Sequence, residues 1–107
     1  MRALVGALAA KLEDALPEAT RVQRRSRGLL RRKGPVVGLD VSVGEDTYAL
    51  RLDGGAVLAR RTKTVRGIAI KSEQLPLDGW LDALTADLAA EAERSEAGRL
   101  ALERLLR

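Results

Sequence analysis

The chain has 107 residues, of which 46% are hydrophobic and 32% are charged, and its net charge is +4. This length suits a single domain over residues 1–107, and the composition is that of a globular protein rather than a disordered or membrane-spanning one. Because the sequence contains no cysteine and no histidine, disulfides, thiol nucleophiles and histidine-based acid–base catalysis are excluded. A cysteine-free chain fits the cytoplasm, where we expect the protein to reside.

The core is predicted to consist of small aliphatic side chains, because Tyr48 and Trp80 are the only aromatic residues. Aromatic side chains bury the most area per residue, so a core of alanine, leucine and valine is a modest one. A modest core gains stability by burying more surface against a partner or a second copy. The composition therefore favours self-association or a protein partner.

A first helix is predicted over residues 2–16. Leucines recur every four residues from Leu4 to Leu16, which gives one apolar helical face. Pro17 ends the pattern, because a proline disfavours the α conformation in the residue before it. The opposite face carries charges of both signs, so we expect the helix to pack on the protein core rather than on a membrane surface. Charged residues follow the short apolar run, so we interpret it as part of the mature chain and not as a signal peptide.

The apolar period then changes from 3.6 to 2, which predicts strands. In residues 36–43 apolar side chains alternate with small or polar ones, and the alternation continues from Tyr48 to Leu52. Turns containing glycine, at residues 44–46 and 53–55, separate this strand from the next two.

Three further strands complete the predicted sheet. Residues 56–65 form one, and residues 67–72 form a short one with Ile68 and Ile70 on the same face. Residues 20–25 contain Val22 as their one apolar anchor, so they are predicted to form a weak edge strand.

Residues 75–107 return to helical spacing. Asp78 is a good N-cap residue, and apolar residues follow at intervals of three and four from Trp80 to Ala92. Gly98 either breaks this helix or only weakens it, and the leucines beyond it form another apolar patch. The predicted fold class is α+β, with an N-terminal helix, an antiparallel meander of four to five strands and a C-terminal helix, the helices lying on one face of the sheet.

Basic residues gather in two segments of the chain. Residues 20–39 contain seven basic and no acidic residues, residues 55–71 contain five and none, and residues 72–97 have a net charge of −6. Either these segments neighbour acidic ones in a mixed surface, or both basic segments lie on one side of the sheet and bind phosphate backbones or an acidic protein. The candidate contact residues are Arg21, Arg24, Arg25, Arg27, Leu29, Leu30, Arg31, Arg32, Lys33, Arg60, Arg61, Lys63 and Arg66.

The pair Leu29 and Leu30 has no periodic apolar partner in its basic surroundings. A purely electrostatic loop does not need an apolar pair, so this segment fits docking onto a protein or lipid surface at least as well as onto DNA.

Sequence-non-specific nucleic-acid binding is the alternative function. Base stacking on single strands needs aromatic side chains, and the strands offer only Tyr48, which the alternation places on the buried side. The sequence has no helix-turn-helix, zinc-finger or RNP pattern, and the predicted helices are neutral or acidic. Binding restricted to the phosphate backbone is the form of this alternative that stays open.

The stretch VVGLDVSVGEDTYALRLDGGAVLARR, within residues 36–62, resembles the opening hairpin of actin-like sugar kinases and of RNase H-like transposases. The resemblance implies that Asp40 stands where those families have an aspartate of the phosphoryl-transfer or metal site. The kinases place a Gly/Thr-rich phosphate loop directly after that aspartate, whereas this chain has SVGED. A two-metal site needs several converging carboxylates, and Asp40 has no evident partner. We therefore predict no catalytic residue, no metal and no cofactor.

The last candidate surface is the face of the sheet opposite the one that carries the alternating apolar side chains. It is predicted to carry Gly38, Asp40, Ser42, Thr47, Ala49, Arg51 and Ala69. Small residues let another backbone or sheet approach closely, so this face is a candidate interface. The sequence thus predicts a non-catalytic interaction module, a small homodimer or complex subunit with a basic surface, ahead of a nucleic-acid-binding protein and of an actin-like or RNase H-like enzyme fragment.

Overall fold

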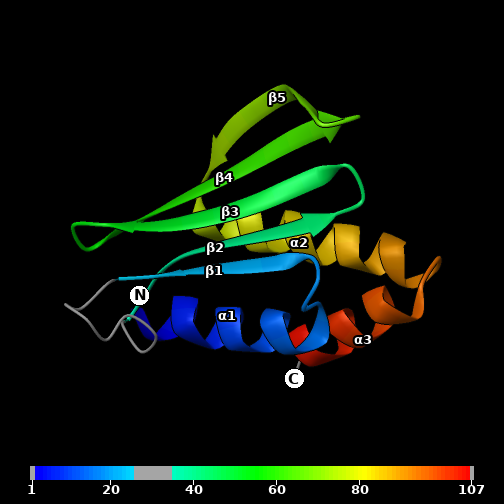
Figure 1. Ribbon diagram of the computed structural model, residues 1–107, viewed down its shortest axis with the longest axis horizontal. Helices are drawn as coiled ribbons and strands as arrows, with labels where there is room; N and C mark the ends of the chain where they lie inside the picture. Colours follow the sequence, from blue (N-terminus) through cyan, green and yellow to red (C-terminus); the bar gives the residue numbers. More distant parts are fainter. Residues whose placement is uncertain (1, 26–34, 107) are drawn as a thin grey trace.

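Three helices lie on one face of a five-stranded antiparallel sheet in the computed structural model, which describes residues 2–25 and 35–106 (Figure 1). This arrangement confirms the predicted α+β class. The elements in chain order are α1 (Arg2–Ala15), β1 (Thr20–Arg24), β2 (Val36–Val43), β3 (Asp46–Asp53), β4 (Ala56–Val65), β5 (Ile68–Leu75), α2 (Leu77–Ala92) and α3 (Glu96–Leu105).

The sheet is a meander in which each strand pairs with its neighbour in the sequence, in the order β1-β2-β3-β4-β5. Tight turns join the central strands, and Gly54 and Gly55 adopt positive φ values of 58° and 91° between β3 and β4. Glycine reaches such values without steric cost, so this turn can close with two residues. The turn also fixes the register, because Asp53 faces Ala56 and the pairing then runs back without interruption to Asp46 facing Lys63.

Helix α1 buries a slightly different stripe from the predicted one. Val5, Leu8, Ala9 and Leu12 are buried, whereas Leu4 is 38% exposed. The end of the helix is tied to the sheet, because the buried Thr20 hydroxyl donates a hydrogen bond to the Leu12 carbonyl oxygen at 3.2 Å. The same carbonyl oxygen accepts a hydrogen bond from the Leu16 amide at 2.7 Å, so the Thr20 hydroxyl adds a second bond at the end of the helix.

The core lies between the helices and the inner face of the sheet. The indole of Trp80 meets the ring of Tyr48 edge to face, with centroids 5.9 Å apart, and its Nε1–H donates to the Arg60 carbonyl at 3.1 Å. Both aromatic residues are fully buried, as the alternation predicted for Tyr48. The other buried core side chains of the sheet and α2 are Leu39, Val41, Val43, Leu50, Ala59, Leu84 and Leu88.

The C-terminal region forms two helices, and the break precedes Gly98. Helix α2 ends at Ala92 and α3 begins at Glu96, directly after Ser95, a residue type favoured at an N-cap. The prediction that Asp78 caps α2 was wrong, because the cap residue is Pro76 and Asp78 instead accepts a hydrogen bond from the Gly79 amide. Proline has no N–H group and suits the start of a helix, which moves the beginning of α2 upstream.

Strand β5 is longer than predicted, and its first half is exposed. Ile68 and Ile70 have exposed fractions of 68% and 62%. The register with β4 shifts at this point, since Lys63 pairs with Lys71 but Thr64 pairs with Ala69, which leaves Ile70 as an extra residue. An extra residue of this kind disrupts the alternation of side chains, so counting in twos does not relate the faces of the two isoleucines here.

Candidate functional site

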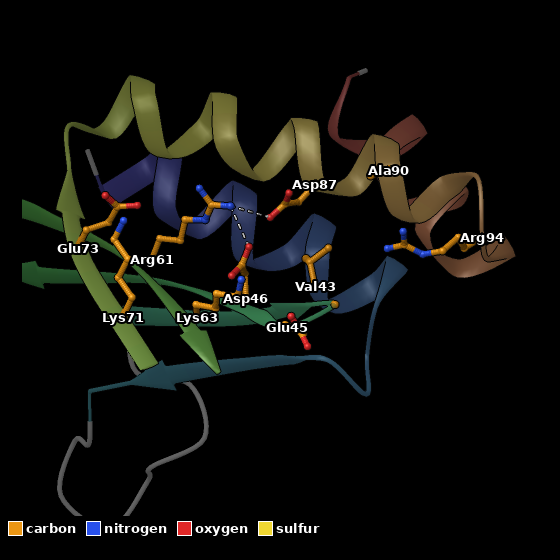
Figure 2. Close-up of a pocket in the computed structure, with 11 residues that line it drawn as sticks. Val43, Glu45, Asp46, Arg61, Lys63, Lys71, Glu73, Asp87, Ala90 and Arg94 are labelled. Carbon is orange, nitrogen blue, oxygen red and sulfur yellow. Dashed lines mark hydrogen bonds and ion pairs between the residues drawn. The ribbon is translucent and has the colours of Figure 1, made fainter. Parts of the chain in front are cut away.

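A polar groove of about 540 Å³ opens where the β2–β3 turn, β4 and β5 meet α2 (Figure 2). Its walls carry four acidic and four basic side chains. The lining residues are Val43, Gly44, Glu45, Asp46, Arg61, Lys63, Lys71, Glu73, Asp87, Ala90 and Arg94.

Arg61 is the centre of this groove. Its guanidinium nitrogen Nη2 lies 2.9 Å from an oxygen of Asp46 on β3 and 3.5 Å from an oxygen of Asp87 on α2 (Figure 2). The guanidinium carbon also lies 5.6 Å from the centroid of the Tyr48 ring, within the range of a cation–π contact. Tyr48 in turn donates its hydroxyl proton to Asp87 and lies 3.2 Å from the Ala83 carbonyl oxygen. These contacts bind the sheet to α2.

The two carboxylates that contact Arg61 have pKa values shifted in opposite directions. Burial by itself raises a carboxyl pKa, but at Asp46 the hydrogen bond and charge of Arg61 outweigh burial and hold the pKa below its ordinary 3.8. At Asp87 burial, helped by the neighbouring Asp46, keeps the pKa above 3.8 despite Tyr48 and Arg61. Burial and the Asp87 carboxylate also raise the pKa of Tyr48, so its hydroxyl remains a hydrogen-bond donor at neutral pH.

The acidic and basic side chains of the groove balance in number, and some of them are paired. Lys63 lies opposite Asp46 in the β3–β4 register, and Arg94, just after α2, pairs with Glu91 at the end of that helix at 2.7 Å. Within residues 2–25 and 35–106, no three side chains of the types that ligate metals are grouped to hold an ion. The contacts of Arg61 therefore join the sheet to α2, and the groove has no excess of positive or negative side chains that would attract a charged ligand.

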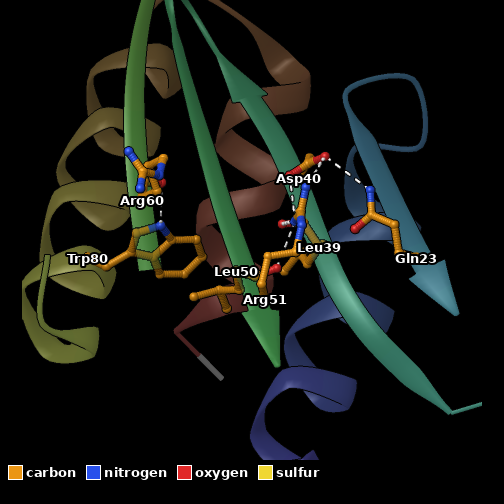
Figure 3. Close-up of polar contacts among 7 residues, drawn as sticks. All are labelled: Gln23, Leu39, Asp40, Leu50, Arg51, Arg60 and Trp80. Carbon is orange, nitrogen blue, oxygen red and sulfur yellow. Dashed lines mark hydrogen bonds and ion pairs between the residues drawn. The ribbon is translucent and has the colours of Figure 1, made fainter. Parts of the chain in front are cut away.

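Asp40, the residue that the kinase and transposase resemblance singles out, lies on the face of the sheet that no helix covers. Its carboxylate is 2.9 Å from Arg51 Nη1 and accepts a hydrogen bond from the Gln23 amide at 3.1 Å (Figure 3). Gly38 makes this cluster fit, because a Cβ there would collide with the Gln23 amide oxygen and press on Arg51. Asp40 thus acts as an anchor for neighbouring side chains on this face.

The uncovered face carries hydroxyl, amide and guanidinium groups in rows across the strands. One row runs Ser42, Thr47, Thr62 and Ser72 by direct cross-strand pairing. The next row runs Arg21, Asp40, Ala49, Arg60 and Gln74. The predicted outward positions on β2 and β3 are those observed.

The basic candidate residues that the structure describes lie on both faces of the sheet. Arg60 belongs to the uncovered face, whereas Arg61 and Lys63 line the groove on the opposite side, and Arg66 sits in the β4–β5 turn. On or beside β1, Arg21, Arg24 and Arg25 are exposed. The remaining candidates lie outside the described residues: Arg27, Leu29, Leu30, Arg31, Arg32 and Lys33.

The inward position of Arg61 has a signal in the sequence that charge counting missed. A two-residue turn at Gly54 and Gly55 pairs residues whose numbers add to 109, so Arg61 faces Tyr48 and shares its buried side. The exposed edge β5 had no comparable signal, because its exposure depends on the extra residue Ile70 and on how far the helices extend.

None of the described helices is long and apolar enough to cross a membrane. Comparisons with protein-family models, with curated proteins and with solved structures found no match to this chain.

Proposed function

We propose that this protein is a non-catalytic interaction domain that pairs its edge strand β5 with a strand of a protein partner, as a homodimer or as a subunit of a larger assembly. The observation that carries the proposal is the exposure of β5. Its first five residues are all exposed, and Ile68 and Ile70 keep more than 60% of their surface in water. In the part of the chain that the structure describes, β5 pairs with β4 alone, so one side of its backbone is free to accept a strand.

The two edges of the sheet differ in a way that supports this choice. Strand β1 carries Arg21 and Arg24, and basic side chains on an edge discourage pairing with another chain. Strand β5 begins with the apolar sequence Ile68–Ile70 and contains one lysine and one glutamate. Natural proteins protect exposed apolar edges unless these edges have a partner.

The groove supports a binding role rather than catalysis. Its central arginine is held by two carboxylates and a tyrosine ring, and these contacts join β3 and β4 to α2. A brace of this kind gives the sheet a rigid edge to present, because it fixes β4, on which β5 rests.

The proposal is tested by sedimentation velocity on the purified protein together with affinity purification of the tagged chain. A dimer or a fixed partner is expected, and the double change Ile68→Lys/Ile70→Lys should abolish the association. The matched control is Leu58→Lys, which alters another partly exposed apolar residue, 41% exposed, on the neighbouring strand β4. A monomer without a partner, or an association that the β5 change leaves intact, would refute the proposal.

Backbone-directed nucleic-acid binding is a second candidate, favoured by the arginines of the uncovered face. Arg21 and Arg60 are exposed there in the same row, with two strands between them, among hydroxyl and amide donors that suit phosphate oxygens. Such binding to random duplex DNA or to RNA should weaken steeply with salt and with the change Arg21→Gln/Arg60→Gln, but not with Arg94→Gln in the connection between α2 and α3. No binding at low salt would end this candidate.

A further inference from the structure

We infer that the strand which pairs with β5 is β5 of a second copy of this chain, in a twofold dimer centred on Ser72. This inference rests on the proposed use of β5 as an interaction edge, and it adds the identity of the partner and the register. It follows from the symmetry of strand pairing and from the order of side chains along β5.

Symmetry restricts the registers that two identical edge strands can adopt. A twofold axis that relates two antiparallel edge strands runs perpendicular to the sheet, so one residue of each strand must face its own counterpart. The helices of both copies then lie on the same side of one continuous sheet. The registers differ only in which residue lies at the axis.

The charges on β5 select among these registers. An axis at Lys71 places two lysines opposite each other, and an axis at Glu73 places two glutamates opposite each other. Like charges directly opposite one another destabilise a strand pair, and opposite charges stabilise it. An axis at Ser72 places Lys71 opposite Glu73 of the second copy twice, once on each side of the axis.

The rest of the strand agrees with this axis. Ala69 then lies opposite Leu75, so an apolar residue near the start of each strand meets the apolar end of the other, and Ile70 lies opposite the uncharged Gln74. An axis at Ile70 instead leaves Lys71 opposite Ala69, and the lysine and glutamate have no charged partners. Lys71 to Leu75 pair with β4 in unbroken register, so the charged part of the edge is regular.

Space beside β5 is also open. In Figure 1, β5 forms the edge of the sheet farthest from α1, and α2 packs beneath β2 and β4. The exposure of the strand from Ile68 to Ser72 confirms that no described helix covers it. A second copy can therefore add to this edge without displacing an element.

Charge reversal tests the register. Lys71→Glu places carboxylates opposite each other at both pairs, and Glu73→Lys does the same with ammonium groups, so each variant should raise the dimer dissociation constant by about tenfold or more. An equimolar mixture of the two variants restores opposite charges at both pairs and should form a heterodimer, and the double variant K71E/E73K should recover the homodimer. Arg25→Glu, a charge reversal at an exposed residue beside β1 on the opposite edge of the sheet, is the control and should leave association unchanged.

A single cysteine gives an independent readout, because the chain contains none. Opposed residues have Cβ atoms about 4.5–5.5 Å apart, close enough for Ser72→Cys to form an intermolecular disulfide after small adjustments. Gln74→Cys is the control, since its counterpart lies four residues along the pair, roughly 13 Å away. Rapid oxidation of the first variant and not of the second is expected.

The outcomes separate this inference from the proposed function. A monomeric chain that binds a different protein through β5 would overturn the inference and leave the proposed function standing. A homodimer that shows no rescue in the mixture and no selective oxidation at residue 72 would also overturn it. A monomer without any partner would refute both.

Discussion

Replacing Tyr48 with phenylalanine removes one oxygen atom from the contact between the sheet and α2. The Tyr48 hydroxyl donates to Asp87 and is close to the Ala83 carbonyl, and the side chain is fully buried. Tyr48→Phe keeps the ring, its edge-to-face contact with Trp80 and its contact with Arg61. The variant therefore isolates the hydrogen bond to the carboxylate.

The expected cost follows from the charge of the acceptor. A hydrogen bond to a charged group contributes about 1.5–3 kcal/mol to the free energy of unfolding. For a domain of this size each kcal/mol shifts the melting temperature by roughly 4–8 °C, so Tyr48→Phe should melt roughly 6–24 °C below the wild type.

The cost should also depend on pH. Because burial raises the pKa of Asp87, its carboxyl group takes up a proton at a higher pH than an ordinary aspartate does. A protonated carboxyl group is a weaker acceptor, so the difference in unfolding free energy between wild type and variant should shrink as the pH falls through this raised pKa.

Thermal and urea unfolding across acidic to neutral pH measure both effects. A double-mutant cycle with Asp87→Asn gives the coupling energy between the two side chains. If Tyr48→Phe is as stable as the wild type at neutral pH, or if its cost does not change with pH, the hydroxyl does not support Asp87 and the reasoning fails.

Three further predictions follow from individual geometries. Arg66 has a φ of 54° in the β4–β5 turn, a backbone conformation in which asparagine is favoured over other side chains. Arg66→Asn should therefore raise the free energy of unfolding by about 0.5–1 kcal/mol and increase the urea midpoint. An unchanged or lower midpoint would contradict this prediction. Trp80→Phe should lower stability by about 1–3 kcal/mol or more in the same assay, because it leaves the Arg60 carbonyl without its donor. The pKa of Tyr48 is raised above 10.0 in the folded state, so its contribution to stability is complete below pH 10 and is lost as the pH rises through the folded-state pKa. Since Tyr48 is the only tyrosine, absorbance should show little tyrosinate at pH 10.0 in the native protein and about half ionisation once it is unfolded.

The alternation of apolar residues predicted most of the sheet. Strands β2 and β4 have the bounds read from the sequence. The apolar residues of β2 repeat every second position, whereas β4 has a blurred pattern and is delimited by the glycine-containing turns on either side. The pattern failed at β5, where an extra residue shifts the register and Leu75 extends the strand into a region whose spacing looked helical. An extra residue in the pairing of two strands cannot be recognised from the spacing of apolar residues along one of them.

The candidate site was less predictable than the fold. Charge counting grouped Arg60 with Arg61, yet adjacent residues of a strand point to opposite faces, so one arginine faces solvent and the other faces Asp46 and Asp87. Asp87 stands on a helix 41 residues after Asp46, and only the packing of α2 on the sheet brings the two carboxylates to one guanidinium. Contacts of this kind need the tertiary arrangement, which a charge count does not contain.

The packing of α1 against α3 has a consequence for the order of folding. Every strand pairs with its neighbour in the sequence, so the hairpins close short loops and form in about 1–10 μs. The contact between α1 and α3, where Arg104 pairs with Asp14 and Ala101 is buried, closes a loop of nearly the whole chain. The entropy lost on closing a loop grows with the length of the loop, so the α1–α3 contact loses the most entropy when it forms from the unfolded chain. Its formation becomes favourable only after the sheet has formed. We therefore expect the contact between α1 and α3 to form after the sheet.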